Sequence, residues 1–279
     1  MNRRAALGAL GAGMLGLALP GFPRARRDRL ASVGLQLYTV RRELARDFDG
    51  TLARVAEIGY REVEFAGYFG REPAAVKAAI DRAGLAAPAA HIPFESLRED
   101  WPRTLEAAAT VGHHWVIVPW IPPEERRPGP LAERFNRAGA AARAAGLRFA
   151  YHNQEYDFAP LVREPHYDLG LPPTLYDWLA SETDIDLELD VYWVIKGGGD
   201  PLTYLERYPG RFPLVHVKDS AGAPSHRMVD VGSGTLDFRA ILARRRQAGI
   251  RHCFAEHDEP ADAFASIRAS YDYLTKLEF

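Results

Sequence analysis

Short apolar runs alternate with longer amphipathic stretches along the chain from Ser32 onward. The runs are β-branched or apolar, whereas the stretches repeat hydrophobic residues at the spacing of one helical face. Each run predicts a strand, and each stretch predicts the helix that follows it. The eight predicted strands cover residues 33–38, 62–67, 86–92, 115–120, 147–153, 185–193, 212–219 and 251–258.

Eight strand and helix pairs in about 250 residues predict a closed parallel barrel, a (β/α)8 TIM barrel in a single domain over residues 31–279. Several predicted helices end in glycine just before the next strand, as at Gly84 and Gly249, which suits a left-handed C-cap and a short loop. A doubly wound open sheet is the alternative. Such a sheet normally has a glycine-rich phosphate turn after its first strand, and "GLQLYTVRR" has no G-x-G-x-x-G. The closed barrel is therefore favoured.

The first thirty residues differ from the rest of the chain. Arg3 and Arg4 precede an apolar run rich in alanine and glycine from Ala5 to Leu19, and Pro20 ends it. This layout predicts an export signal of the twin-arginine type over residues 1–30, and so a periplasmic or secreted protein. The run is short for a bilayer, so we expect no stable membrane anchor. A cytoplasmic protein with a disordered basic N-terminus is the alternative.

Composition and charge narrow the functional class. The chain has 279 residues, of which 47% are hydrophobic and 26% charged, as is usual for a soluble globular enzyme. The net charge is -2 and the basic residues are scattered, so nucleic acid is not an expected partner. Cys253 is the one cysteine, which excludes an internal disulfide. The oligomeric state is not predicted.

The predicted strands end in polar or ionisable side chains, at the face where a TIM barrel builds its active site. Strands five to eight supply His152, Asp190, His216 and Glu256. Buried charge on four consecutive strands is costly unless a cation or a substrate lies among the groups. We therefore expect a divalent metal site, and these nitrogen and oxygen donors suit manganese, magnesium, zinc and cobalt alike.

Other strand-end residues are expected to bind a substrate or to transfer protons. Flat aromatic side chains at the predicted mouth suit the C–H face of a sugar ring. The residues expected to bind substrate are Gln36, Tyr38, Glu64, His91, Trp120, Asn153 and Trp193. Those expected to be catalytic are Glu256, Lys218, Glu155 and His257. Lys218 is either a base or a donor to a developing oxyanion.

Three motifs, "ELDVYW", "HVKDS" and "FAEHDEP", follow one another at the ends of predicted strands six, seven and eight. They resemble the sugar phosphate isomerase/epimerase superfamily with the xylose-isomerase-like barrel, over residues 31–279 and most closely its exported branch. The resemblance implies a divalent cation held by Asp190, His216, Glu256 and a carboxylate from strand five. His152 stands where that family has a glutamate, so the last ligand is His152, Glu155 or Asp157.

The resemblance implies a metal-dependent enzyme that acts on a sugar or keto sugar through an enediolate, as an isomerase or epimerase. The same site could cleave a 3-keto-glycoside by elimination, as a lyase or hydrolase. A carbohydrate-binding barrel without catalysis is a further alternative, favoured by the departure at His152. The superfamily also includes repair enzymes of the endonuclease IV type, but Trp193 stands where those have a second histidine. A DNA substrate is therefore not expected.

Overall fold

The computed structural model describes residues 28–161 and 174–279 of the chain. Nearly all of the predicted export signal, residues 1–27, lies outside the described residues. Within the described part of the chain, no helix combines the length and the hydropathy needed to cross a bilayer.

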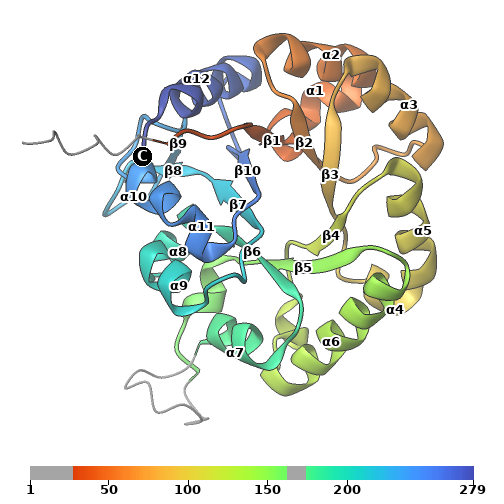
Figure 1. The fold of residues 1–279 in the computed structure, drawn as a ribbon, viewed down its shortest axis with the longest axis vertical. Helices are drawn as coiled ribbons and strands as arrows, with labels where there is room; N and C mark the ends of the chain where they lie inside the picture. The colour runs from red at the N-terminus through yellow and green to blue at the C-terminus, as the bar shows by residue number, and fades with distance from the viewer. Residues whose placement is uncertain (1–27, 162–173) are drawn as a thin grey trace, which may run out of the picture.

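Eight parallel strands close into a barrel, and helices surround it on the outside (Figure 1). Each barrel strand pairs with the next barrel strand along the chain, and the last barrel strand pairs with the first. The barrel strands are β1 (Gly34–Gln36), β2 (Glu62–Ala66), β3 (Ala86–His91), β4 (Trp115–Val118), β5 (Arg148–His152), β6 (Asp186–Asp190), β7 (Leu214–Val217) and β10 (His252–Ala255). The predicted single-domain TIM barrel is confirmed.

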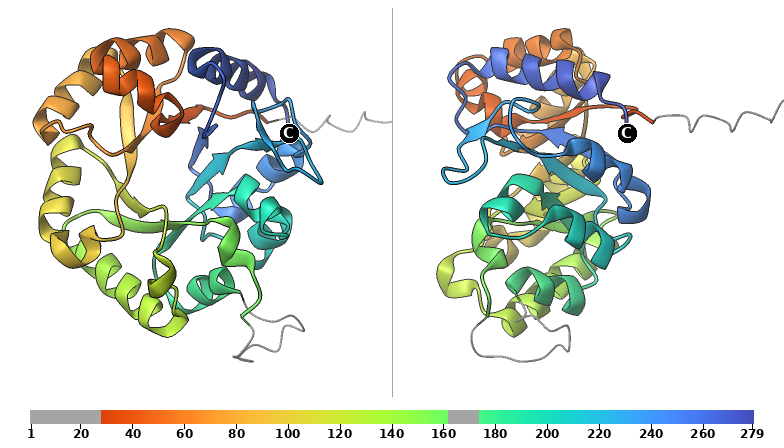
Figure 2. Two further views of the ribbon diagram at one scale, coloured as in Figure 1. Left: turned by 180° about the vertical axis from the view of Figure 1, so that it is seen from behind. Right: turned by 90° about the vertical axis from the view of Figure 1, so that its left-hand side faces the viewer.

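The connections between strands are mostly helical, and Figure 2 shows their ring from behind and from the side. The α-helices are α1 (Arg41–Arg46), α2 (Phe48–Ile58), α3 (Pro73–Ala83), α4 (Ser96–Glu99), α5 (Trp101–Val111), α6 (Pro128–Ala144), α7 (Leu175–Glu182), α8 (Val191–Lys196), α9 (Pro201–Arg207), α10 (Phe238–Ala243), α11 (Arg245–Ala248) and α12 (Ala263–Lys276). Short 3-10 turns are η1 (Leu37–Val40), η2 (Pro123–Glu125) and η3 (Glu155–Phe158). The predicted C-cap glycines Gly84 and Gly249 have φ of 67° and 85°, as a left-handed cap requires.

Apolar side chains fill the inside of the barrel. A compact group consists of Ala89, Trp115, Ile117, Ala150, Leu214 and Phe254, all buried. Gly34 lies so close to this group that a Cβ atom there would be 2.3 Å from the ring of Phe254. The interior is therefore closed by packing, and polar side chains gather above it, at the carboxyl ends of the strands.

Two local features differ from the prediction. The strand predicted to run to residue 193 ends at Asp190, because the Asp190 carboxylate accepts hydrogen bonds from the amides of Tyr192 (2.9 Å) and Trp193 (3.1 Å) and so caps α8. The residues of "VYW" favour strands, so the sequence pattern did not indicate that a helix begins here. An antiparallel ribbon of β8 (Asp219–Ser220) and β9 (Met228–Val229) also follows β7 and was not expected from the pattern.

Candidate active site

Four side chains meet at the carboxyl ends of β5, β6, β7 and β10. His152 Nε2 lies 3.2 Å from Asp190 Oδ2, and His216 Nδ1 lies 3.8 Å from that oxygen and 2.7 Å from Glu256 Oε2. All four side chains are buried, and one donor atom of each lies within 4.8 Å of the others. We call His152, Asp190, His216 and Glu256 the strand-end cluster. The structure thus brings together the four residues that the sequence proposes as metal ligands.

The ammonium group of Lys218 lies among three carboxylates beside this cluster. Its Nζ is 3.1 Å from Asp190 Oδ2, 2.9 Å from Glu256 Oε2 and 2.9 Å from Asp258 Oδ1. Burial by itself lowers the pKa of Lys218, but the three carboxylates raise that pKa well above its usual range. Lys218 therefore stays protonated at neutral pH. Of its two expected roles, this favours the hydrogen-bond donor over the base.

A second group of ionisable side chains lies deeper in the barrel and shares His216. His216 Nε2 is 2.6 Å from Glu64 Oε2 and 3.2 Å from Glu188 Oε1, while His91 Nε2 is 2.9 Å from Glu188 Oε2. We call Glu64, His91, Glu188 and His216 the deep cluster. The imidazole of His216 therefore joins the two clusters, with Nδ1 facing the first and Nε2 facing the second.

Nearby glutamates set the protonation of His216 and His91, whereas burial sets that of His152. Burial by itself lowers the pKa of His216, but the three glutamates around it raise that pKa well above its usual range. The pKa of His91 is raised to about 9, because the two glutamates of the deep cluster outweigh the effect of burial. Burial lowers the pKa of His152, and the positive charge of His216 adds to this. His152 is therefore neutral at neutral pH, as a metal ligand or a base must be.

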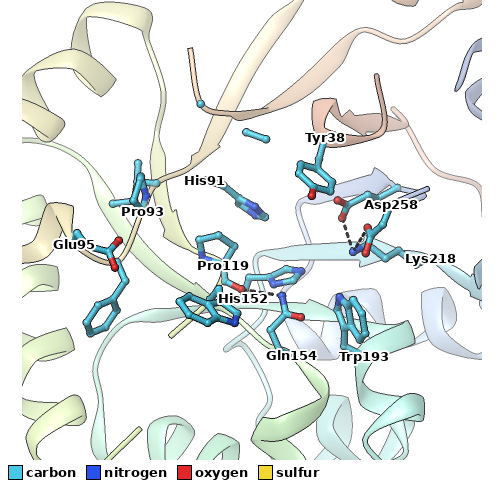
Figure 3. A pocket seen from close by; sticks show the side chains of 16 residues that line it. Tyr38, His91, Pro93, Glu95, Pro119, His152, Gln154, Trp193, Lys218 and Asp258 are labelled. Carbon is cyan, nitrogen blue, oxygen red and sulfur yellow. Dashed lines mark hydrogen bonds and ion pairs between the residues drawn. The ribbon is translucent and has the colours of Figure 1, made fainter. Parts of the chain in front are cut away.

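A cavity of about 550 Å³ opens above the strand-end cluster (Figure 3). In Figure 3 the side chains of His91 and His152 point into the middle of the cavity, and Tyr38 and Trp193 flank the ion pair of Lys218 with Asp258. The predicted site residues that line the cavity are Tyr38, His91, Trp120, His152, Trp193, Lys218 and Glu256.

The other seven predicted site residues lie outside this lining: Gln36, Glu64, Asn153, Glu155, His257 and the cluster members Asp190 and His216. Gln36 and Glu64 are fully buried, and Gln36 Nε2 donates a 2.6 Å hydrogen bond to Glu64 Oε2. The side-chain amide of Asn153 holds the backbone of Asp190. Its Oδ1 accepts a hydrogen bond from the Asp190 N–H (2.9 Å), and its Nδ2 donates one to the Asp190 carbonyl (3.1 Å). His257 is also buried. The structure therefore places Gln36, Glu64 and Asn153 behind the cluster, as its supports, where a substrate contact was expected.

The residue from β5 that belongs to the strand-end cluster is His152. Glu155 is half-buried in η3 and is not among the described residues that line the cavity. Asp157 is buried, and its Oδ2 accepts hydrogen bonds from the Tyr151 hydroxyl (2.6 Å) and the Gln154 amide (2.7 Å). Because the Tyr151 ring packs against α6, outside the barrel, Asp157 is directed away from the cluster.

The buried Asp157 makes stability depend on pH. Burial raises the pKa of this carboxyl to about 7, so the folded chain keeps a proton that the unfolded chain releases near its ordinary pKa of 3.8. The associated stability is complete below about pH 4 and is lost as the pH rises through about 7.

We therefore expect wild type to lose on the order of 3 kcal/mol between about pH 5 and about pH 8 relative to the Asp157→Asn variant, whose amide does not ionise. Thermal melts of both proteins across this range measure the difference. Melting profiles that run parallel would show that Asp157 titrates as an ordinary carboxyl.

Four residues of the site were not singled out by the sequence pattern: Glu188, Glu95, Gln154 and Asp258. Glu188 lies two residues before Asp190 and therefore on the same face of β6. The alternation of side chains along a strand could therefore have identified Glu188 as a site residue. Asp258 follows Glu256 at the same spacing. Glu95 lies in the loop after β3, and no local pattern marks it.

The strand-end cluster has the donor chemistry of a cation site. It offers two imidazole nitrogens and two carboxylates, a set that suits a divalent transition metal or magnesium. His216 Nδ1 and Glu256 Oε2 are buried without a hydrogen bond of regular geometry. Their closest contacts among the described residues are ion pairs, 2.7 Å between the two atoms and 2.9 Å from Glu256 Oε2 to Lys218 Nζ, and a cation bound by both atoms would satisfy them.

Comparisons with known proteins agree with the fold. Residues 52–277 match the family described as xylose isomerase-like TIM barrel. The crystal structure of a sugar phosphate isomerase/epimerase from Parabacteroides distasonis ATCC 8503 is 26% identical, with a TM-score of 0.76 over 88% of this chain and 98% of that chain. The structure of an L-ribulose 3-epimerase shares the fold at 15% identity, with a TM-score of 0.62 over 88% of this chain and 93% of that one.

A curated relative, inosose dehydratase from Lacticaseibacillus casei, is 27% identical over 139 residues, or 43% of this chain. The match spans 43% of that relative's own length. The strand-end motifs, the closed barrel and the family match all lead to the same assignment. Because the match extends over most of the sequence, this chain belongs to the xylose isomerase-like TIM barrel family.

Proposed function

We propose that this protein is a divalent-metal-dependent enzyme of the isomerase/epimerase type, which removes and returns a proton beside the carbonyl of a sugar or keto sugar. The observation that carries the proposal is the strand-end cluster, in which four buried donors from four strands lie beside a cavity of about 550 Å³. The similarity to a protein named sugar phosphate isomerase/epimerase supports the same class.

The metal would be held by His152, Asp190 and Glu256, and by His216 through the Nδ1 atom that faces them, from which the cation would displace the proton. Manganese, magnesium, zinc and cobalt all suit this donor set. A divalent cation bound there polarises a substrate carbonyl and acidifies the adjacent C–H bond.

Glu256 and His152 are the groups that can take the proton. Burial by itself raises the pKa of Glu256, but Lys218 and His216 lower it well below its usual range, so the carboxylate is ionised. His152 is neutral, because burial and the charge of His216 lower its pKa. The two lie at opposite ends of the arc formed by β5, β6, β7 and β10. Such a pair suits removal of a proton from one face of a carbon and its return to the other.

Lys218 supplies the positive hydrogen-bond donor of this mechanism. Its ammonium group lines the cavity next to both Asp190 and Glu256, where charge develops on the substrate oxygen. A fixed donor at that position stabilises the developing oxyanion more than the neutral carbonyl.

Elimination is the second candidate reaction, because it begins with the same proton removal. Departure of an oxygen at the next carbon would cleave a 3-keto-glycoside or expel water. The relative named inosose dehydratase favours keeping this candidate.

Incubation of the full-length, metal-loaded protein with aldoses, ketoses, their phosphates and 3-keto-glycosides in heavy water tests the proposal. Deuterium beside the carbonyl, read by proton NMR, supports it, and the product separates epimerisation, isomerisation and elimination. An absence of exchange across the panel, with metal bound, would leave a carbohydrate-binding barrel without catalysis.

Glu64→Gln should weaken metal binding ~10- to 100-fold without unfolding the protein. The Glu64 carboxylate lies 2.6 Å from His216 Nε2, and an amide is a weaker acceptor that no longer favours a proton on that nitrogen. Competition with a coloured chelator measures the affinity.

Glu62→Gln is the matched control, because Glu62 pairs with His252 Nδ1 at 3.0 Å on the same strand, away from the cavity. Its metal affinity should equal that of wild type. Equal affinities in both variants would show that Glu64 does not position His216.

A further inference from the structure

The cavity lining carries more negative than positive charge. Among the described residues that line it, Lys218 is the one lysine or arginine, whereas Glu95, Glu256 and Asp258 are carboxylates. The positive charge of His91 is matched by the two glutamates of the deep cluster, at 2.9 and 3.2 Å from its Nε2. Sites for phosphate groups present free arginine or lysine donors, and this lining does not.

The charge of Lys218 is already balanced. Its Nζ has three carboxylate ion-pair partners, on Asp190, Glu256 and Asp258, at 2.9 to 3.1 Å. An anionic substituent on the substrate would compete with these fixed carboxylates for the ammonium group. Its own charge would meet those carboxylates.

Arginines near the cavity are also held by the fold. Arg41 Nη1 donates to the carbonyls of Tyr38 (2.8 Å) and Asp258 (2.6 Å). Arg126 Nε donates to the Ile121 carbonyl at 2.9 Å, and its guanidinium lies 3.3 Å from the centre of the Tyr156 ring. Neither arginine lines the cavity.

The divalent cation proposed above does not reverse this balance. Asp190 and Glu256 would neutralise its charge, since both belong to the strand-end cluster. Asp258 and Lys218 neutralise each other, and Glu95, an exposed side chain at the far side of the lining, adds one further negative charge (Figure 3).

The rim of the cavity is aromatic. The large hydrophobic side chains exposed in the described part of the chain are Tyr38 (40%) and Trp120 (47%), and both line the cavity. Exposed aromatic faces beside a cavity are binding surfaces for flat apolar groups, such as the C–H face of a sugar ring. At roughly 30 Å³ for each water molecule, the cavity has the volume of about 18 waters, which is ample for a ligand larger than one hexose.

We propose that this cavity selects an uncharged glycoside, with its reacting sugar at the strand-end cluster and its second ring against Tyr38 and Trp120. Phosphate esters and carboxylated forms of the same sugar are excluded by the surplus of carboxylates. This substrate class rests on the proposed sugar chemistry, and it departs from the phosphate in the name of the similar Parabacteroides protein.

Binding of matched sugars to the full-length protein tests the proposal. Three sets, built on fructose, tagatose and 3-keto-glucose, each contain the free sugar, its phosphate ester and a disaccharide or glycoside in which that sugar keeps its carbonyl, and quenching of tryptophan fluorescence reports binding. We expect the phosphate ester to bind at least ~10-fold more weakly than the free sugar, and the glycoside roughly three- to tenfold more tightly. A phosphate ester that binds as well as its parent overturns the proposal, and so does a failure of every glycoside to bind better than its parent.

Asp258→Asn identifies the source of the selectivity. This change removes one ion-pair partner of Lys218 and one negative charge from the lining, so the ratio of phosphate-ester to free-sugar affinity should rise ~10-fold. Glu72→Gln removes an equal charge at an exposed side chain outside the lining, and should leave the ratio unchanged. Equal ratios in the two variants would overturn the assigned role of Asp258.

Trp120→Ala identifies the position of the second ring. Trp120 is about half exposed, so its truncation should leave the fold intact. The preference for the glycoside over the free sugar should disappear, whereas binding of the free sugar should persist. A glycoside preference that survives the substitution overturns the placement of the second ring.

These results separate the substrate class from the reaction. Tight glycoside binding without deuterium exchange would keep the selectivity and reject the proposed reaction. Deuterium exchange together with equal binding of phosphate esters would keep the reaction and reject the selectivity.

Discussion

Asp190→Asn should lose its divalent metal, with an affinity more than ~10²-fold below that of wild type, and its turnover should fall with it. Asp190 Oδ2 lies within 4 Å of His152, His216 and Lys218, so its charge is central to the strand-end cluster. An amide oxygen carries no charge and binds a divalent cation poorly, and loss of a ligand exceeds the 10- to 100-fold effect of losing a residue that only supports one. Elemental analysis and chelator competition measure the loss.

Asparagine is chosen because Asp190 also caps α8 through Oδ1, and asparagine is an equally good cap. Asp200→Asn is the matched control, since Asp200 caps α9 in the same way, accepting from the amides of Leu202 and Thr203, at an exposed position. The control should keep metal and turnover. Full metal content in Asp190→Asn would reject the metal site.

Lys218→Met should reduce turnover by ~10² to 10³ while the metal stays bound. The ammonium group acts mainly on the oxyanion of the transition state, so its removal lowers kcat more than it raises KM. It also leaves Asp190, Glu256 and Asp258 without their common lysine partner, which increases the attraction of the site for a cation. The combination of retained metal and lost turnover distinguishes this variant from Asp190→Asn.

Lys196→Met is the control for Lys218→Met. Lys196 is exposed, and its Nζ lies 4.5 Å from the centre of the Trp193 ring, outside the cavity lining. Its loss should leave kcat unchanged. If Lys218→Met turns over at the wild-type rate, or loses its metal, the assigned role of Lys218 is wrong.

The sequence by itself determined the architecture and grouped the four residues that meet at the strand ends. The hydrophobic pattern repeats every two residues in a strand and every 3.6 residues in a helix, so strands and helices can be distinguished along the chain. Because parallel strands place their carboxyl ends on one face, His152, Asp190, His216 and Glu256 could be grouped before any distance was known. The limit of strand six was misjudged, since Val191 favours a strand and only the capping contacts of Asp190 start α8 there.

The tertiary structure decided which of these groups contact one another and how they are charged. The barrel brings Glu64, from β2, to 2.6 Å from His216, from β7, a pairing across 152 residues that no local pattern encodes. It also surrounds Lys218 with three carboxylates, which keeps it protonated and leaves the cavity without a free cation among its described lining residues. Period and composition are properties of neighbouring residues, whereas protonation and hydrogen bonding depend on distances of a few ångströms between distant parts of the chain. Only the closed barrel sets those distances.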